Sequence, residues 1–370
     1  MLNYSEFYKK LFVLRLIFGL IVLFCLPTSH LSAIGIKNIQ PVFNDRFYSE
    51  QKYLSQINFR PPAFQTSGKK IIVAIIDEGV DFTHPDLQSL DSGKSWNFLD
   101  NNNNLTPKGP HGTRLAGIIA ANPNNYEGVV GMAQNAKIMS LIACDAAYGC
   151  SPSAIIQAIY YVADNGASAI NLSFGDTAGY SEIYNSAIAY ANHKGVIIVA
   201  AAGGVSQGLD LSEKPISPVC NDRPDPTLSP SLGSENMVIG VSSIDENSQL
   251  TSWANYGNCV DIYGPGTNIF TTASSMYDGT DYGYFSGSSY SAGIVMGFIA
   301  AAKSINPNLS QAQAIQLFKN QRLDVDGSLL LINQKIKAAP KVKGAKALKT
   351  KGIQTAVKTL KINPLKEKFR

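Results

Sequence analysis

The amino-acid sequence predicts an α/β fold of three layers, with a central, mostly parallel sheet and helices on both faces. Between residues 69 and 320, short apolar runs of strand length alternate with stretches of helical length. The strand-length runs are almost continuously apolar, which is typical of parallel strands that are buried on both faces. The chain has 370 residues, of which 45% are hydrophobic, enough for one large domain or two small ones.

The expected elements follow one another in this alternation. The expected strands are 71–76, 137–143, 168–172, 196–200 and 237–241. The expected helices are 111–120, 151–165, 181–193, 289–303 and 310–319. Several helices begin at serine, which caps helix N-termini well. In open α/β sheets the binding site lies beyond the carboxyl ends of the strands, so we look for the chemistry there.

The first 33 residues have the outline of a secretory signal peptide. Three basic residues precede the apolar run 16–26, and small residues end at Ala33. The apolar run has 11 residues, which is short for a membrane span, so an uncleaved anchor is the alternative reading. We therefore expect a secreted, periplasmic or cell-envelope protein.

Composition divides the rest of the chain. Residues 34–67 are polar and irregular and contain Pro61-Pro62, which predicts a linker or short pro-segment before a main domain at 68–340. Residues 341–370 carry ten Lys or Arg residues and one Glu, a net charge of +9, whereas 34–340 carry 18 basic and 25 acidic residues, a net charge of −7. We expect a flexible basic tail; contact with an anionic surface is its functional alternative. We expect a monomer without a nucleic-acid partner.

Four cysteines follow the signal peptide. An even count in an exported protein favours disulfides. Cys144 and Cys150 flank a plausible turn, so we pair them, which leaves Cys220 with Cys259. Free buried thiols are the alternative. None of the four histidines has zinc-ligand spacing to these cysteines.

Three stretches could carry chemistry. The segment 285–297 is rich in Gly and Ser and opens a long apolar helix, where free N–H groups and the helix dipole favour an oxyanion. Asp77 ends the strand 71–76, and His111 opens a helix of small residues. Each feature alone is more often structural: a capping serine, an aspartate after a strand, a histidine at a helix start.

Together these stretches resemble the subtilisin-like serine proteases, or subtilases. Three family motifs occur in order: Asp77-Glu-Gly-Val-Asp81 with His84-Pro-Asp-Leu87, His111-Gly-Thr-Arg-Leu-Ala-Gly117, and Gly287-Ser-Ser-Tyr-Ser-Ala-Gly293. Four supporting blocks fit as well: 128–133, 171–175, the Ala-Ala-Gly turn at 201–203, and 252–266. The resemblance covers about residues 68–335 and implies a subtilisin-like peptidase domain.

The resemblance implies the roles of the site residues. Ser289 attacks the scissile carbonyl, His111 takes its proton, and Asp77 orients the imidazole. Ser173, Phe174 and Gly175 form the strand that holds an extended protein or peptide substrate, and Ala202 and Gly203 border the pocket before the cleaved bond. Asp86 matches a calcium ligand of many relatives, with 122–128 as its partner loop, so Ca²⁺ is a structural ion to consider. No cofactor is required.

The sequence departs from the family motifs at four positions. Gly204 stands where relatives have the Asn whose amide completes the oxyanion hole, which leaves the backbone N–H of Ser289; loss of one such donor costs about 10²–10³-fold in turnover. Arg114, Gly293 and Glu78 replace His, Pro and Ser/Thr. Glu78 adds charge near the orienting carboxylate of Asp77, although we expect the two side chains to point apart, as neighbours on a strand do.

Two functions follow from the departures. The first is an exported serine endopeptidase that works through an acyl-enzyme, slowed by Gly204. The alternative is a subtilase-fold protein that binds extended peptides with little or no cleavage.

Overall fold

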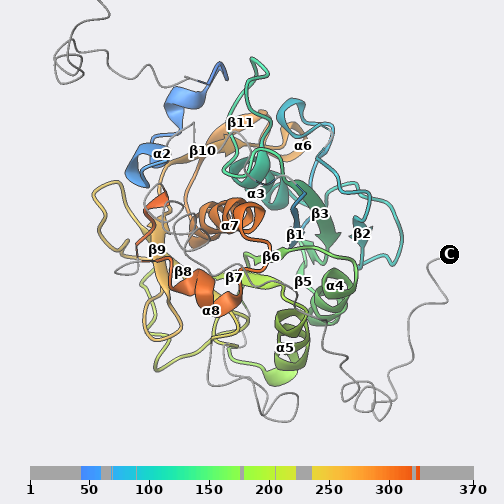
Figure 1. Ribbon diagram of the computed structural model, residues 1–370, viewed down its shortest axis with the longest axis vertical. Coiled ribbons are helices and arrows are strands. Elements are labelled where there is room, and N and C mark those ends of the chain that lie inside the picture. Colours follow the sequence, from blue (N-terminus) through green and yellow to red (C-terminus); the bar gives the residue numbers. More distant parts are fainter. Residues whose placement is uncertain are drawn as a thin grey trace, which may run out of the picture. The chain divides into compact units, whose positions relative to one another are not determined.

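The computed structural model describes residues 43–59, 68, 70–88, 90–175, 179–204, 206–221, 236–318 and 322–325. The expected signal peptide and basic tail lie outside these residues. Within them, a seven-stranded sheet has the order β2-β3-β1-β6-β7-β8-β9, and all its neighbouring strands pair in parallel (Figure 1). The predicted α/β fold class is therefore confirmed.

The strands of the sheet are β2 (Trp96–Asn97), β3 (Lys137–Ile142), β1 (Ile72–Asp77), β6 (Ala169–Leu172), β7 (Ile197–Ala201), β8 (Ile239–Ile244) and β9 (Ile262–Pro265). Two short antiparallel pairs lie outside the sheet: β4 (Cys144–Asp145) with β5 (Gly149–Cys150), and β10 (Ile269–Thr272) with β11 (Tyr282–Phe285). Five of the sheet strands were expected from their apolar runs; β2 and β9 were not.

The helices are α2 (Tyr53–Gln56), α3 (His111–Ala120), α4 (Pro152–Asp164), α5 (Asn185–His193), α6 (Ser275–Asp278), α7 (Ser288–Ile305) and α8 (Gln311–Ile315). Ser151 caps α4, where its side chain accepts the N–H of Ala154, and Ser310 forms a capping box at α8. Residues 181–193 divide into a short 3₁₀ turn, Glu182–Tyr184, and α5. No helix in the described part of the chain has the length and apolarity of a membrane span.

Two apolar cores lie on opposite faces of the sheet. Alternate residues of β1 enter different cores: Val73 and Ile75 join one, and Ala74 and Ile76 join the other. The first core contains α3 and α7, and the second contains α4 and α5 (Figure 1). The expected three layers are thus present.

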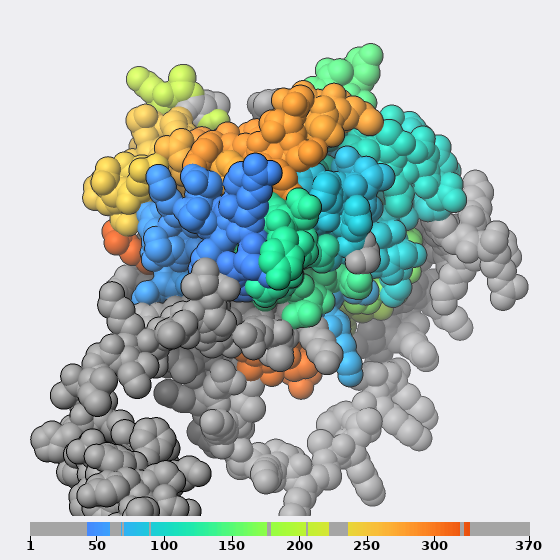
Figure 2. Space-filling view, turned by 90° about the horizontal axis from the view of Figure 1, so that it is seen from above, coloured from blue at the N-terminus to red at the C-terminus, as the bar shows by residue number. Residues whose placement is uncertain are grey.

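Residues 43–59, part of the expected linker or pro-segment, pack against this body. Phe43, Tyr53 and Leu54 belong to the same core as α7. The amide of Gln51 both donates to the carbonyl of Val130 and accepts from its N–H, at 2.9 and 2.8 Å. Figure 2 shows the segment, in blue, beside the orange β10–β11 region and the green loop at 122–128. This part of the segment is therefore packed on the body, and it contains two short helical turns, Tyr48–Glu50 and α2.

Both expected disulfides are present. Cys144–Cys150 closes the β4–β5 hairpin, and Cys220–Cys259 joins the segment after β7 to the segment before β9. The short turn between Cys144 and Cys150 was sufficient to predict the pairing.

Candidate active site

Asp77 and His111 form a hydrogen-bonded pair at the carboxyl end of β1, in which Asp77 is buried and the side chain of His111 is 22% exposed. The imidazole Nδ1 lies 3.0 and 2.9 Å from the two carboxylate oxygens of Asp77, which is 2% exposed. A carboxylate at Nδ1 keeps a proton on that nitrogen and leaves Nε2 free to accept one. Burial alone would lower the pKa of His111, but the attraction and hydrogen bond of Asp77 outweigh it, so this pKa lies above its ordinary value.

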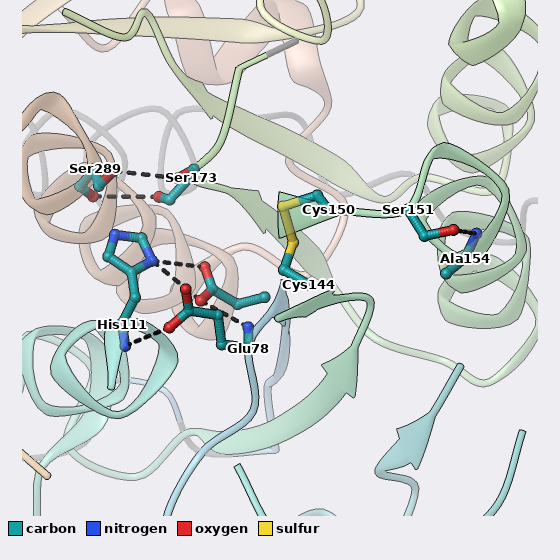
Figure 3. Close-up of a disulfide and its surroundings, with 9 residues drawn as sticks. Glu78, His111, Cys144, Cys150, Ser151, Ala154, Ser173 and Ser289 are labelled. Atoms are coloured by element: carbon teal, nitrogen blue, oxygen red, sulfur yellow. Dashed lines mark hydrogen bonds and ion pairs between the residues drawn. A yellow bond between two sulfur atoms is a disulfide. The ribbon is translucent and has the colours of Figure 1, made fainter. Parts of the chain in front are cut away.

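Ser289 lies in the first turn of α7, next to this pair. The ring of Tyr290, the following residue, is 5.8 Å from the ring of His111 between centroids. Ser289 Oγ donates to the carbonyl of Ser173 at 3.1 Å, and Ser173 Oγ donates to the carbonyl of Ser289 at 3.3 Å (Figure 3). The structure thus brings the three expected residues into one region, with the hydroxyl of Ser289 bonded to Ser173 and not to His111.

Small residues let α3 and α7 approach this region closely. A Cβ on Gly112 would lie 2.2 Å from the carbonyl oxygen of Gly79, and one on Gly293 would lie 3.2 Å from Leu115 Cδ2. Gly293, where relatives have Pro, therefore suits the tight packing of α7 on α3.

Gly204, which the sequence resemblance aligns with the family's oxyanion Asn, has no room for a side chain. Its Cβ would lie 2.7 Å from both Cε3 and the carbonyl oxygen of Trp253. Such distances are well below ordinary van der Waals contact. Trp253, which the sequence placed only within a supporting motif, occupies the space beside this position.

The expected substrate-binding residues lie around the same end of the sheet. Ser173, Phe174 and Gly175 continue from the end of β6, and Gly175 is exposed. Ala202 is buried, its carbonyl accepts from Asn255 Nδ2 at 2.8 Å, and Gly203 turns the chain with a φ of +80°. Sequence reasoning missed Asn255. Residues 205 and 222–235, in the expected pocket-floor loops, lie outside the described residues.

Glu78 points toward His111, contrary to expectation. The strand ends at Asp77, so the alternation of a strand does not extend to Glu78. Its Oε2 accepts the backbone N–H of His111 at 3.0 Å, and its own N–H donates to Asp77 Oδ1 at 2.8 Å (Figure 3). Two consecutive carboxylates therefore contact one histidine.

Arg114, where relatives have His, joins three elements near the site. Its guanidinium forms an ion pair with Asp278 of α6 and donates to the hydroxyl of Tyr290 at 3.3 Å. It also lies over the ring of Phe285, 4.0 Å from the centroid. The sequence marked Arg114 as a departure but did not predict these partners.

Asp86 lies in a second buried polar cluster. Its carboxylate accepts from Asn125 Nδ2 at 2.8 Å and from the N–H of Val129 at 2.7 Å, so the expected loop is its partner. Asp45 is 5% exposed, and its Oδ1 has no hydrogen-bond partner. Burial and the charge of Asp86 raise the pKa of Asp45. The cluster thus holds two buried carboxylates, one of them with an oxygen that has no hydrogen-bond partner. Among the described residues, no group of three or more His, Cys, Asp or Glu side chains is placed to hold a metal ion.

Sequence comparison decides the family. The Subtilase family profile matches residues 68–351. The chain belongs to the subtilase family of subtilisin-like serine proteases. Among curated proteins, the thermophilic serine proteinase of Bacillus sp. (strain AK1) is 36% identical over 278 residues, which is 74% of this chain and 63% of that protein. Thermitase of Thermoactinomyces vulgaris is 34% identical over 274 residues, 73% of this chain and 88% of thermitase.

Solved structures agree with this subtilase fold. A protease of Pseudoalteromonas arctica PAMC 21717 superposes with a TM-score of 0.66 at 23% identity, covering 78% of this chain and 99% of that one. The epidermin leader peptide processing protease of Staphylococcus aureus also has a TM-score of 0.66, at 22% identity, covering 80% and 84%. At these identities the two structures show a shared fold only.

Proposed function

We propose that this subtilase is an exported serine endopeptidase that cleaves extended protein or peptide substrates through an Asp77–His111–Ser289 triad. The observation that carries the proposal is the Asp77–His111 pair at 2.9 Å, with Ser289 in the helix turn that borders it. Family membership and the 34% identity to thermitase support a peptidase. The two disulfides support export into an oxidising compartment.

The proposed reaction begins when the hydroxyl of Ser289 turns from the Ser173 carbonyl to Nε2 of His111. Ser289 Oγ then attacks the scissile carbonyl while its proton passes to Nε2, and Asp77 stabilises the imidazolium. The tetrahedral oxyanion accepts a hydrogen bond from the backbone N–H of Ser289. Collapse breaks the C–N bond, and His111 returns the proton to the leaving amine. Water then hydrolyses the acyl-enzyme by the same proton route.

Binding without cleavage is the second candidate function. It is supported by one observation: Trp253 leaves no room for a side chain at Gly204, the position that the family resemblance assigns to the oxyanion amide. The exposed segment around Gly175 could still pair with an extended peptide. In this case Ser289 would retain its bond to Ser173 when peptide is bound.

A peptidyl fluorophosphonate probe separates the two functions. The enzyme proposal expects labelling of Ser289 that is lost in Ser289→Ala and reduced by orders of magnitude in His111→Ala. Cleavage of a peptide library should follow the same pattern. Absence of both labelling and cleavage in the folded wild-type chain, with peptide binding retained, would instead identify a binding protein.

We also propose a structural Ca²⁺ between Asp45 and Asp86. Carboxylates of both residues and oxygens of the loop 122–128 would hold it, and the ion would neutralise the two buried charges. The unpartnered Oδ1 of Asp45 supports this assignment. The proposed ion is structural and has no assigned role in the catalytic steps.

A further inference from the structure

The carboxylate of Glu78 lies at the N-terminus of α3, the helix whose first residue is His111. The first N–H groups of a helix have no partner within the helix. The residue before α3, Pro110, makes no side-chain capping bond. Glu78 Oε2 accepts the N–H of His111 at 3.0 Å, so the helix is capped from the end of β1, at the residue that carries the imidazole (Figure 3).

The surroundings of this carboxylate are built to hold it. A Cβ on Gly109 would lie 2.1 Å from Glu78 Oε2 and 2.8 Å from Ala146 Cβ. Gly109 has no positive φ, so a side chain there would meet no backbone strain, but it would press on Ala146 and displace the carboxylate of Glu78 from its present position. The N–H of Lys108 also donates to the backbone carbonyl of Glu78 at 2.7 Å. Glu78 thus binds the segment before α3 through its backbone carbonyl and the first residue of α3 through its side chain.

We propose that Glu78 is a positioning residue for His111. Two consecutive residues then hold one histidine: Asp77 binds its imidazole ring, and Glu78 binds its backbone N–H. The inference rests on the proposed role of His111 as general base. A fixed helix start keeps the imidazole within reach of Ser289. The negative charge also favours the imidazolium that forms when Ser289 is deprotonated.

The charges around the pair define the expected pH dependence. Asp77 and Glu78 favour the protonated imidazole of His111, and Arg114 opposes it. Burial, the largest effect, raises the pKa of Glu78; the N–H of His111 lowers it, Asp77 raises it, and His111 and Arg114 lower it. Removing the charge of Glu78 should therefore lower the pKa of His111 and extend activity to lower pH.

The test compares Glu78→Gln with Glu182→Gln in the full-length chain. Gln at position 78 keeps an acceptor oxygen but loses the charge, and Glu182 is an exposed control. In kcat/KM profiles against pH, the pKa of the acidic limb should fall by about half a unit in Glu78→Gln, the order of effect expected when one nearby charge is removed even with water-like screening. Glu182→Gln should leave it unchanged, and KM should stay constant in both variants.

A second variant tests the hydrogen bond. Glu78→Ala leaves the N–H of His111 without its acceptor, so kcat should fall about tenfold or more, whereas Glu78→Gln should retain most of it. If Glu78→Ala does not fold, the Gln variant alone decides. The inference is overturned if the pKa of the acidic limb in Glu78→Gln equals that of the wild type. It is also overturned if a folded Glu78→Ala variant has a kcat within twofold of the wild-type value.

An NMR titration separates this inference from the proposed function. In a Ser289→Ala background, the Cε1 proton of His111 reports its pKa without any catalysis. A lower pKa on adding Glu78→Gln supports the inference even if the wild-type chain cleaves nothing, which would refute only the endopeptidase. An unchanged pKa refutes the inference even if the enzyme is active.

Discussion

The contact between Gly204 and Trp253 shows that the absence of a side chain at position 204 is tied to local packing. The sequence shows only that an amide donor is absent at position 204. The structure adds that a Cβ there would lie 2.7 Å from the indole and from a backbone oxygen. Because a backbone oxygen cannot rotate away, the conflict extends beyond the indole ring. Loss of the donor is therefore coupled to the packing of the segment around Trp253.

We predict that Gly204→Asn will not restore the oxyanion donor. The new side chain must displace the segment at Trp253, so the free energy of unfolding should fall by about 1–3 kcal/mol and kcat should not rise. Gly204→Ala, which adds the Cβ without an amide, should lose similar stability. Chemical denaturation and steady-state kinetics measure both effects. A tenfold gain in kcat at unchanged stability would show that the segment yields and that the missing donor alone limits turnover.

Sequence reasoning at the residue scale succeeded where a motif fixes the register. Asp77, His111 and Ser289 were selected from 27 acidic residues, four histidines and a serine cluster, and the structure brings them together. Their chemical roles stay predictions. The direction of Glu78 was wrong, because a strand pattern does not show at which residue the strand ends. Trp253 and Asn255 were missed, because their contacts join residues about 50 positions apart.

At the scale of elements, Arg114 connects the helix that carries His111 to its neighbours. The Asp278 ion pair reaches α6, the Tyr290 bond reaches α7, and the Phe285 contact reaches β11. The Arg114 and Asp278 side chains are only 18% and 13% exposed, so the pair is screened little by solvent. Removal of one partner would leave the other charge poorly solvated.

We predict that Arg114→Met will lower the free energy of unfolding by about 1–3 kcal/mol, since it leaves Asp278 without its cation in a partly buried place. The matched control is Lys194→Met. Lys194 pairs with Asp164 at 3.2 Å, but the two side chains are 43% and 56% exposed, so we expect at most about 0.5 kcal/mol. Urea denaturation of both variants gives the comparison. Equal losses would mean that the Arg114 network adds no more than a surface pair.

The elements that could be predicted from sequence are those with long apolar runs. The strands β1, β3, β6, β7 and β8 lie within three residues of the expected bounds, and α3 matches them. The strands β9, β10 and β11 were missed because Gly, Pro, Thr or Tyr residues interrupt their apolar runs. Their pairing depends on distant partners, which local composition does not show.

At the scale of the described molecule, the segment 43–59 is joined to the main body by side chains that look unremarkable in the sequence. Gln51 bonds the main chain of Val130, and Tyr284 donates to Glu50 at 2.6 Å. Asp45 lies near Asp86, so one end of the proposed cation site comes from this segment and the other from the body. The polar composition of the segment suggested a linker, because composition alone does not show whether a polar side chain is buried or exposed to solvent.

The proposed calcium ion would therefore fasten the segment to the body. We expect calcium at about 100 times its dissociation constant to stabilise the fold by about 2.7 kcal/mol over a chelated sample, seen as a rise of several degrees in the thermal midpoint. Asp45→Asn should abolish most of this gain, whereas Asp164→Asn, at an exposed carboxylate, should retain it. Mg²⁺ should replace Ca²⁺ poorly, because it dehydrates reluctantly.

The calcium proposal also predicts that the stabilisation depends on pH, and the pKa of Asp45 determines the direction of that dependence. Burial raises the pKa of this carboxyl, and calcium binds only its ionised form. The calcium-dependent rise in the thermal midpoint should be full near neutral pH and should vanish as pH falls through the raised pKa, above the range of an ordinary aspartate. Thermal unfolding from pH 7 to about pH 4, with calcium and with chelator, measures it. If the two curves coincide at every pH, the Asp45–Asp86 cluster holds no ion and its hydrogen bonds alone secure the segment.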